Sequence, residues 1–293
     1  MSYQLMQVDA FTDRPLAGNP CAVVLDADDL SAEVMQAVAR EMNLSETSFV
    51  VGSEVADFGV RYFTPAEEIP LAGHPTIATA KALADWGRLE AGRPRITLEM
   101  RVGPIRVDLE WDGERLARAT MSQKRPMFLR TYDPAAVMPL FGLTPADLLP
   151  GAPIQTVSTG TPQLMIPVTD VRVLHRCGVD RDAYVRLRAD GDFFSPHLFC
   201  LGGFTDDGDT AARHFGVPPD TFEDPFTGSA TGGMAAYLWH HGFIDDPVFV
   251  AEQGHPIGRP GKADVEVVGP PADIETVRVG GPAVTVFRGT LEL

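Results

Sequence analysis

The chain has 293 residues, and with 44% hydrophobic and 22% charged residues it has the composition of an ordered protein long enough for two domains. Its net charge of −16 argues against nucleic acid or an anionic membrane as a partner, because phosphate binding needs clustered Lys and Arg. No segment approaches the roughly 18 apolar residues of a membrane helix, the start Met1–Gln4 carries no export signal, and the three cysteines lie far apart, so we expect a reducing, cytoplasmic setting.

The first half of the chain predicts two helices among short strands. One helix is expected after the N-cap Ser31, with an apolar face at every third or fourth residue and a stop at Asn43. A second is expected from about Pro75 to Trp86, closed by Gly87. The strand-like stretches of this half are 4–10, 21–25, 47–51, 60–63, 95–98, 105–111 and 117–122.

The second half predicts the same order of elements. Strands at 154–158 and 164–168 flank a turn at Gly160, and a further strand covers 193–201. A helix is expected from Ala230 to His241, with Gly242 as its stop. Short strands close the chain, the last of them at 283–293.

The two halves also repeat one another residue by residue. The pattern Glu-x-Pro-x-x-Gly covers 68–73 and again 223–228, an offset of 228 − 73 = 155. The other matches are Leu83 with Leu238 and Gly87 with Gly242 at that offset, Arg61-x-Phe63 with Arg213-x-Phe215, and Gly18-x-Pro20 with Gly160-x-Pro162. Matches in the same order indicate two copies of one structural unit.

Strand propensity is plentiful and helices are few, which decides the expected fold class. Each copy is predicted to be a mixed, mostly antiparallel sheet wrapped around a central helix rather than a doubly wound parallel sheet. The predicted fold is therefore α+β with two pseudo-symmetric domains. We place the N-terminal domain at 1–115, completed by the C-terminal strand 283–293, and the C-terminal domain at 116–282.

Each repeat turns into its helix at a glycine, Gly73 or Gly228, a residue that tolerates unusual backbone angles. The amides of a helix's first turn and the positive end of its dipole favour an anion. Two such starts facing each other would hold a carboxylate without Lys or Arg. The alternative is that both are only structural turns into helices.

Three side chains near these starts are candidates for moving protons. His74 follows the first glycine, Asp224 stands where the first copy has Ile69, and Glu46 lies between an amphipathic helix and an apolar strand. A carboxyl packed against apolar neighbours there would have a raised pKa, suited to proton transfer near neutrality. A capping histidine, an ordinary turn aspartate and a solvated loop glutamate are the structural alternatives, and sequence spacing alone does not bring Glu46 to His74.

Signatures of metal and cofactor chemistry are missing from the sequence. The seven histidines and three cysteines form no HExxH or CxxC spacing. No Gly-x-Gly-x-x-Gly follows a predicted strand, and neither a P-loop lysine nor Gly-x-Ser-x-Gly occurs. We therefore expect neither a cofactor nor a metal.

A set of long motifs runs through almost the whole chain in a fixed order. The chain resembles the phenazine-biosynthesis PhzF-like proteins, which share the diaminopimelate epimerase fold. The motifs that carry the resemblance are Val8-Asp9-Ala10-Phe11-Thr12, Gly18-Asn19-Pro20, Asn43-Leu44-Ser45-Glu46-Thr47, Arg61-Tyr62-Phe63-Thr64-Pro65, Leu71-Ala72-Gly73-His74-Pro75-Thr76 and Glu223-Asp224-Pro225-Phe226-Thr227-Gly228-Ser229-Ala230.

The resemblance implies an active site in the cleft between two domains, a homodimer, and no cofactor or metal. The phenazine enzyme isomerises trans-2,3-dihydro-3-hydroxyanthranilate by moving a proton between ring carbons. By that likeness Glu46 is the general acid/base, and His74 and Asp224 assist the proton traffic. The remaining site residues implied are substrate-binding: Asn19, Gly73, Thr227, Gly228 and Ser229.

One departure from the related epimerases limits the chemistry. Those enzymes carry a cysteine at each helix start as an acid/base pair, whereas this chain has Ala72-Gly73-His74 and Asp224-Pro225-Phe226-Thr227-Gly228 there. A two-thiol racemase is therefore not expected. Two alternatives to the isomerase stay open: a metabolite-binding protein of this fold without turnover, and an amino-acid epimerase that uses Glu46 and Asp224 as its acid/base pair.

Overall fold

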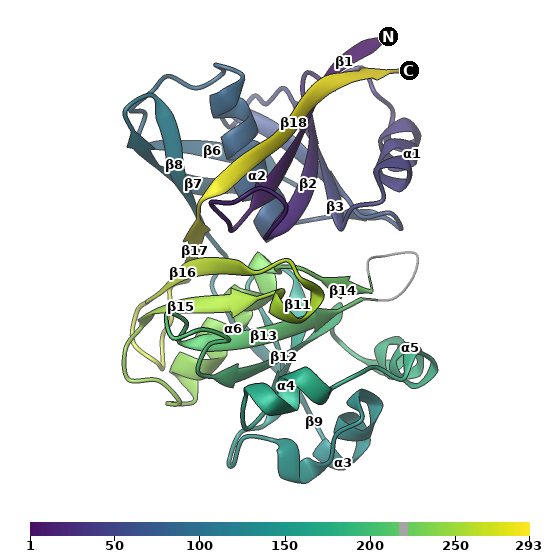
Figure 1. Ribbon diagram of the computed structural model, residues 1–293, viewed down its shortest axis with the longest axis vertical. Coiled ribbons are helices and arrows are strands. Elements are labelled where there is room, and N and C mark those ends of the chain that lie inside the picture. Colours follow the sequence, from purple (N-terminus) through teal and green to yellow (C-terminus); the bar gives the residue numbers. More distant parts are fainter. Residues whose placement is uncertain (217–221) are drawn as a thin grey trace. The chain divides into compact units, whose positions relative to one another are not determined.

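The computed structural model describes residues 1–216 and 222–293, which divide into two compact units (Figure 1). Unit 1 contains Met1–Ser122 and Val279–Leu293, and unit 2 contains 123–216 and 222–278. Each unit combines a sheet that is mostly antiparallel with one buried central helix, so the predicted α+β class is confirmed. Within the described ranges, no helix has the length and apolar character that crossing a membrane requires.

Unit 1 is a sheet with strand order β18-β1-β2-β3-β4-β6-β7-β8. The pairs β2–β3 and β4–β6 are parallel and the others antiparallel, and a two-residue strand, β5, pairs with β4. The strands are β1 (Ser2–Ala10), β2 (Asn19–Val24), β3 (Glu46–Val51), β4 (Phe58–Phe63), β5 (Glu68–Ile69), β6 (Arg95–Met100), β7 (Gly103–Asp112), β8 (Arg115–Ser122) and β18 (Ala283–Glu292). The helices are α1 (Ala32–Met42) and α2 (Gly73–Asp85).

Unit 2 has the corresponding order β9-β10-β11-β12-β13-β15-β16. Here β11–β12 and β13–β15 are parallel, and the two-residue strand β14 pairs with β13. The strands are β9 (Met127–Tyr132), β10 (Ile154–Ser158), β11 (Pro162–Pro167), β12 (Ser195–Leu201), β13 (Thr210–Phe215), β14 (Glu223–Asp224), β15 (Val248–Gln253) and β16 (Gly261–Val268), and β17 (Thr276–Gly281) leads back to unit 1. The α-helices are α3 (Pro134–Val137), α4 (Val171–Arg176), α5 (Arg181–Asp190) and α6 (Gly228–His240), with short 3-10 turns at Met138–Phe141, Pro145–Asp147 and His255–Ile257.

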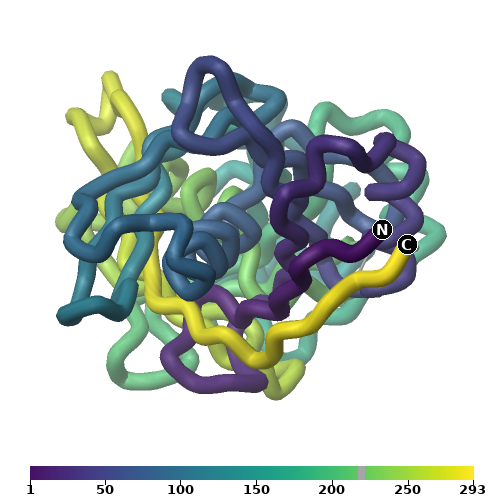
Figure 2. Tube along the Cα trace, turned by 90° about the horizontal axis from the view of Figure 1, so that it is seen from above, coloured from purple at the N-terminus to yellow at the C-terminus, as the bar shows by residue number. Residues whose placement is uncertain are grey.

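The outer strand of each sheet comes from a segment that follows the other repeat. The strand β9 follows β8 along the chain and joins unit 2, whereas β18 follows β17 and joins unit 1. In unit 1 this places the two chain ends side by side, as Figure 2 shows from above. Ser2 pairs with Glu292, and the Leu293 amide donates to the Met1 carbonyl over 2.9 Å.

The central helices α2 and α6 are buried on every side over their first three turns. All residues from Gly73 to Leu83 and from Gly228 to Leu238 are buried, as expected for a helix without a polar face. Small residues allow the close approach. A Cβ on Gly232 would lie 2.0 Å from the Gln123 side-chain oxygen, so a larger residue there would displace Gln123.

Both central helices begin two residues earlier than the sequence predicted, at Gly73 and Gly228 rather than at 75 and 230. Pro75 occupies the third position of the first turn, where its missing amide hydrogen has no intrahelical partner to lose. The ends agree with the prediction to within a residue, and Gly87 and Gly242 have the left-handed φ values of +69° and +70° that follow a helix end.

The first helix, α1, agrees with its prediction at both ends. The Ser31 side chain accepts from the Val34 amide over 3.4 Å, and Asn43 terminates the helix with φ +50°. Its Met35, Val38 and Ala39 are buried.

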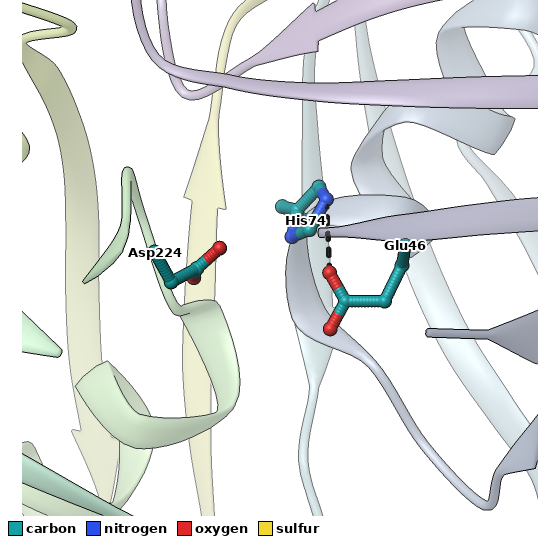
Figure 3. A group of neighbouring side chains, drawn as sticks. All are labelled: Glu46, His74 and Asp224. Carbon is teal, nitrogen blue, oxygen red and sulfur yellow. Dashed lines mark ion pairs between the residues drawn. The ribbon is translucent and has the colours of Figure 1, made fainter. Parts of the chain in front are cut away.

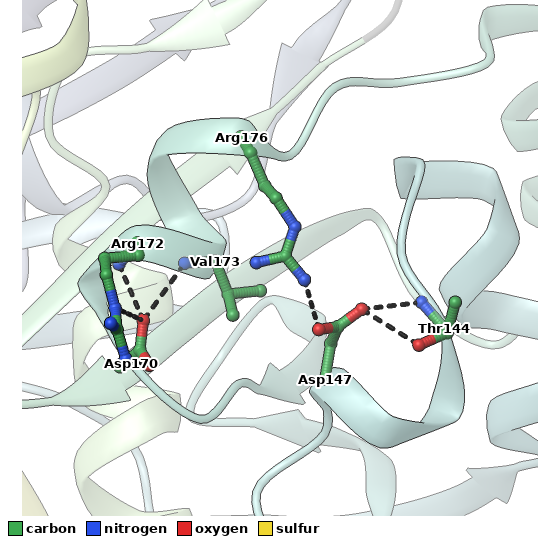
Figure 4. Close-up of polar contacts among 6 residues, drawn as sticks. All are labelled: Thr144, Asp147, Asp170, Arg172, Val173 and Arg176. Carbon is green, nitrogen blue, oxygen red and sulfur yellow. Dashed lines mark hydrogen bonds and ion pairs between the residues drawn. The ribbon is translucent and has the colours of Figure 1, made fainter.

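Unit 2 contains three helices that the sequence prediction missed, α3, α4 and α5. They are short or weakly apolar, and α5 buries only Tyr184. Each nevertheless begins at an aspartate N-cap, and Figure 4 shows the one on α4. Asp170 accepts from the amides of Arg172 (2.8 Å) and Val173 (3.2 Å), and the neighbouring Asp147 accepts from the Thr144 amide and pairs with Arg176.

Candidate active site

The first turn of α2 forms the helix start of unit 1. Its N-cap, Ala72, is extended and makes no side-chain cap, and the turn contains no acidic residue. The Thr76 hydroxyl donates to the Ala72 carbonyl over 2.7 Å, and the buried Tyr62 hydroxyl lies 3.0 Å from the same Thr76 oxygen. The positive end of a buried helix therefore contains no fixed counter-charge of its own, which suits an anionic ligand.

Glu46, His74 and Asn19 come together at this helix start, which their spacing in the sequence could not show. The His74 Nε2 atom lies 3.3 Å from a Glu46 carboxylate oxygen, and Asn19 Nδ2 lies 2.9 Å from His74 Nδ1 (Figure 3). The His74 side chain is 3% exposed and that of Glu46 18%. Asp224, drawn in the same figure, belongs to unit 2 and is described with that unit below.

The Asn19 contact fixes the protonation pattern of the pair. An amide nitrogen only donates, so His74 Nδ1 accepts, and the ring proton is at Nε2, the nitrogen that lies 3.3 Å from Glu46. Glu46 is therefore not the solvated loop glutamate weighed as an alternative. It begins β3 and pairs in register with Cys21 of β2.

Cys21 has no role as an acid or base in this arrangement. Burial, together with the Glu46 charge, raises the pKa of its thiol well above the usual value. Cys177 and Cys200 are buried as well, and burial raises the pKa of each of these thiols. None of the three is at a helix start.

The first turn of α6 forms the helix start of unit 2 and repeats the construction of α2. The Thr231 hydroxyl donates to the carbonyl of the N-cap Thr227 over 3.0 Å, as Thr76 does to Ala72. The Gly228 carbonyl accepts from Gln123 Nε2 over 2.8 Å, and Ser229 is buried. This turn also lacks an acidic residue.

Asp224 is held just before that helix by two neighbours. The Thr227 hydroxyl donates to its carboxylate, and Gln253 Nε2 donates to its backbone carbonyl over 2.7 Å. The Gln253 oxygen also accepts from the Thr227 amide over 3.1 Å. Sequence reasoning missed Gln253. Its signal is the following Gly254, whose φ is +84° and whose Cβ would lie 2.6 Å from the Pro225 carbonyl.

The repeated Arg-x-Phe and Glu-x-Pro motifs form the same ion pair in both units. Arg61 makes two contacts of 2.8 Å with Glu68, and Arg213 makes contacts of 2.8 and 2.7 Å with Glu223. Each pair joins a long strand to the two-residue strand that precedes the helix start. Bidentate Arg–carboxylate pairs are geometrically specific, so this pair explains why the motif occurs twice.

Comparisons with known proteins decide the family. The model of the Phenazine biosynthesis-like protein family, PhzC-PhzF, matches residues 8–289. The chain belongs to this family. A Bacillus subtilis relative named "Uncharacterized isomerase YfhB" is 35% identical over 268 residues, covering 90% of each chain. The trans-2,3-dihydro-3-hydroxyanthranilate isomerase of Pseudomonas chlororaphis is 33% identical over 288 residues, covering 98% of each chain.

Solved structures agree with this PhzC-PhzF assignment. A Bacillus anthracis phenazine biosynthesis protein of the PhzF family is 32% identical, with a TM-score of 0.88 and full coverage of both chains. A probable proline racemase from Agrobacterium radiobacter, 13% identical with a TM-score of 0.72, covers 99% of this chain and 93% of its own and shows the likeness of fold alone. The expected family and fold are thus confirmed, and this PhzC-PhzF protein is an isomerase or epimerase.

Proposed function

We propose that the protein is a cofactor-independent isomerase that shifts a proton on a small carboxylate-bearing substrate, in the manner of trans-2,3-dihydro-3-hydroxyanthranilate isomerase. The observation that carries the proposal is the Glu46–His74 pair, 3.3 Å apart at the buried start of α2. A carboxylate supported by a histidine beside an anion-favouring helix end has the parts that such a reaction needs.

The proposed reaction divides the work between backbone and side chains. The amides of Gly73 and His74 hold the substrate carboxylate, and the Glu46 carboxylate removes a proton from carbon. The C–H electron pair enters the conjugated system, and the same carboxyl returns the proton at a second carbon. While Glu46 is ionised, the Nε2–H of His74 donates to its carboxylate and stabilises this base between the two proton transfers.

The proposal assigns residues of unit 2 to the same reaction, because the two helix starts have the same construction. Gly228 and Ser229 supply a second pair of first-turn amides, and Thr227 holds the Asp224 carboxylate in place. Asp224 assists the proton traffic, and Asn19 holds His74 in the tautomer that serves Glu46. We also propose that the protein works in the cytoplasm as a homodimer, and sedimentation of the purified chain at twice the monomer mass of 31.6 kDa tests the dimer.

Deuterium exchange tests the proposed reaction. The protein is incubated in D2O with trans-2,3-dihydro-3-hydroxyanthranilate and with a panel of related cyclic and amino acids, and deuterium uptake is followed by NMR. We expect uptake with at least one of these acids, lost in Glu46→Gln and kept in Glu41→Gln, whose side chain is exposed on α1.

Other outcomes separate the alternatives. Tight binding of an acid by calorimetry, unchanged by Glu46→Gln and without exchange, would establish a binding protein and end the proposal. Inversion at a single α-carbon, seen by polarimetry and dependent on both Glu46 and Asp224, would establish an epimerase in place of the proton-shifting isomerase.

A further inference from the structure

Unit 2 contains a buried polar cluster that the proposed reaction does not use. We call Gln163, Ser195, His197 and His214 the histidine cluster. All four are buried, His197 completely. The Ser195 hydroxyl lies 2.8 Å from the Gln163 oxygen and 2.7 Å from His214 Nε2, and the Nδ1 atoms of His197 and His214 are 3.3 Å apart.

Hydrogen-bond accounting assigns one tautomer to each ring. The Ser195 hydroxyl donates to the Gln163 oxygen, so its lone pair accepts from His214 Nε2–H. A neutral His214 ring then has Nδ1 as an acceptor, which takes the Nδ1–H of His197. His197 Nε2 is consequently a buried lone pair, and it accepts no hydrogen bond from any described residue.

The histidine cluster lies beside Asp224 in the β13–β14 ladder. His214 and Asp224 face each other across the antiparallel β13–β14 pair, where opposite side chains are neighbours on one face. The ring is neutral, because burial lowers the pKa of His214 to about 4 even though the Asp224 charge raises it, and burial together with His214 lowers the pKa of His197 well below its usual value.

The corresponding place in unit 1 has no titratable pair near neutral pH. There the β4–β5 ladder sets Tyr62 opposite Ile69, and the Tyr62 hydroxyl binds Thr76. In unit 2 a histidine and an aspartate occupy the two corresponding positions. A purely structural ladder needs neither residue, as unit 1 demonstrates.

Other charged side chains near β13 form ion pairs that do not involve His214. Consecutive strand residues point to opposite faces, so Arg213 and Glu223 pair with each other on the other face. The titratable groups that face His214 are His197 on β12 and Asp224 on β14. Other titratable groups on the elements packed against β13 include Cys200 on β12, Cys177 after α4 beside Arg213, and Glu252 on β15 beside Lys262.

We propose that His214 is a positioning residue that acts through Asp224: its neutral imidazole, fixed by Ser195 and His197, leaves Asp224 able to gain and lose a proton, and its protonation holds Asp224 as a carboxylate and stops the reaction. This inference rests on the proposed function for its catalytic consequence. The electrostatic coupling between the two side chains does not depend on it. Protonation of His214 thus sets one of the pH values below which the activity falls, although His214 does not contact the substrate.

The coupling is measured first, without turnover. Histidine-labelled protein is titrated by NMR, with the His214 signal assigned by its loss in His214→Gln. In Asp224→Asn the carboxylate charge is gone, so the His214 midpoint falls by about one pH unit. The matched control, Asp206→Asn in an exposed loop, leaves it unchanged. An equal midpoint in Asp224→Asn and wild type would overturn the inference.

The catalytic consequence is measured next, as the pH profile of deuterium exchange. Gln at 214 retains an N–H donor for Ser195 but cannot become charged. We expect His214→Gln to keep kcat near neutrality within about threefold and to remove one protonation from the acid limb, lowering its logarithmic slope from two to one. A superimposable profile in wild type and His214→Gln would overturn the inference.

Failure of the proposed function looks different from failure of this inference. If wild-type protein exchanges no proton on any acid tested, the proposed reaction is wrong, and the NMR midpoint alone decides whether His214 and Asp224 are coupled. If His214→Gln does not fold, the pH profile of Ser195→Ala replaces it. Loss of the Ser195 acceptor frees the His214 ring from its fixed tautomer, and we expect the acid limb to move; an unmoved limb would count against the inference.

Discussion

The first turns of α2 and α6 are held in place by the same contacts, which we call the frame. They differ in the neighbouring side chains that take no part in those contacts. In both units a bidentate Arg–Glu pair fixes the short strand before the helix, and a threonine four residues past the N-cap binds the N-cap carbonyl. Around that frame, unit 1 has Glu46 and His74, whereas unit 2 has Asp224 and Ser229. The strand register shows which residues correspond. Glu46, the first residue of β3, is opposite Cys21 on β2, and at the equivalent place in unit 2 Ser195, the first residue of β12, is opposite Gln163 on β11.

This comparison separates the residues that stabilise the fold from those that the proposed reaction uses. What both units retain holds a buried helix against its sheet, and what only one unit has includes the residues that the proposed reaction uses. Substitutions in the frame should therefore change the free energy of unfolding, and substitutions outside it should change rates.

The largest expected effect is on turnover in unit 1. Replacing Glu46 with Gln removes the carboxylate beside His74 and should lower the exchange rate by about 10³-fold, with an unchanged melting temperature. Exchange kinetics and calorimetry of Glu46→Gln and Glu41→Gln measure this. A Glu46→Gln variant that retains more than a tenth of the wild-type rate would remove Glu46 from its assigned role.

Acid should destabilise unit 2 before unit 1. Burial lowers the pKa of His214 from 6.5 to about 4, so the native state binds this proton less readily than the unfolded chain does. The stability from the neutral ring is complete above pH 6.5 and is lost as the pH falls toward 4, by roughly 3 kcal/mol at about 1.4 kcal/mol per unit. Urea unfolding between pH 7 and pH 4 tests this, and His214→Gln should flatten the dependence. A wild-type stability that is constant over this range would contradict the expectation.

The two Arg–Glu pairs should differ in strength, because they differ in burial. The side chains of Arg213 and Glu223 are 11% and 9% exposed, against 31% and 18% for Arg61 and Glu68. Glu223→Gln leaves a buried guanidinium without its charge partner and should cost about 3 kcal/mol, whereas Glu68→Gln should cost about 1 kcal/mol. Denaturant titration compares the two variants, and equal losses would show that burial does not govern these pairs.

The smallest effects are expected at the two threonines. Thr231→Val removes one hydrogen bond and should cost about 1 kcal/mol, while Thr76→Val also removes the contact of the buried Tyr62 hydroxyl with Thr76 and should cost about 2 kcal/mol. Adding Tyr62→Phe to Thr76→Val removes the hydroxyl that has lost its Thr76 contact and should recover part of the loss. A double variant less stable than Thr76→Val alone would refute the role given to Tyr62.

Much of the fold could be predicted because its signals are local. Ser31 and Asn43 mark the ends of α1 by their side-chain and backbone preferences, and Gly87 and Gly242 mark the ends of α2 and α6. A local signal also misled at the start of α2, where Pro75 in the first turn suggested a later beginning. The missed helix α4 has a local signal too, the Asp170 cap, but too short an apolar pattern to draw attention to it.

The candidate site was harder to predict, because its contacts join distant segments. Glu46 reaches His74 through the parallel pairing of β2 with β3, a long-range register that no sequence window contains. Gln253 and Gln123 come from other segments, and their side-chain amides donate hydrogen bonds to backbone carbonyls at the start of α6. Such side-chain contacts leave no periodic pattern. Only two glycines mark them in the sequence: Gly232, which makes room for Gln123, and Gly254, which follows Gln253 and lies close to the Pro225 carbonyl.

The exchange of outer strands between the repeats has a consequence for synthesis on the ribosome. The strands β9 to β16 of unit 2 emerge as one nearly continuous stretch, so that unit can close its sheet while translation continues. In unit 1, β1 emerges first and waits for β18, its antiparallel neighbour, which is made last among the described strands. The half that contains Glu46 and His74 therefore completes its sheet only after β18 has emerged, and a nascent chain stalled before residue 283 exposes the open edge of β1.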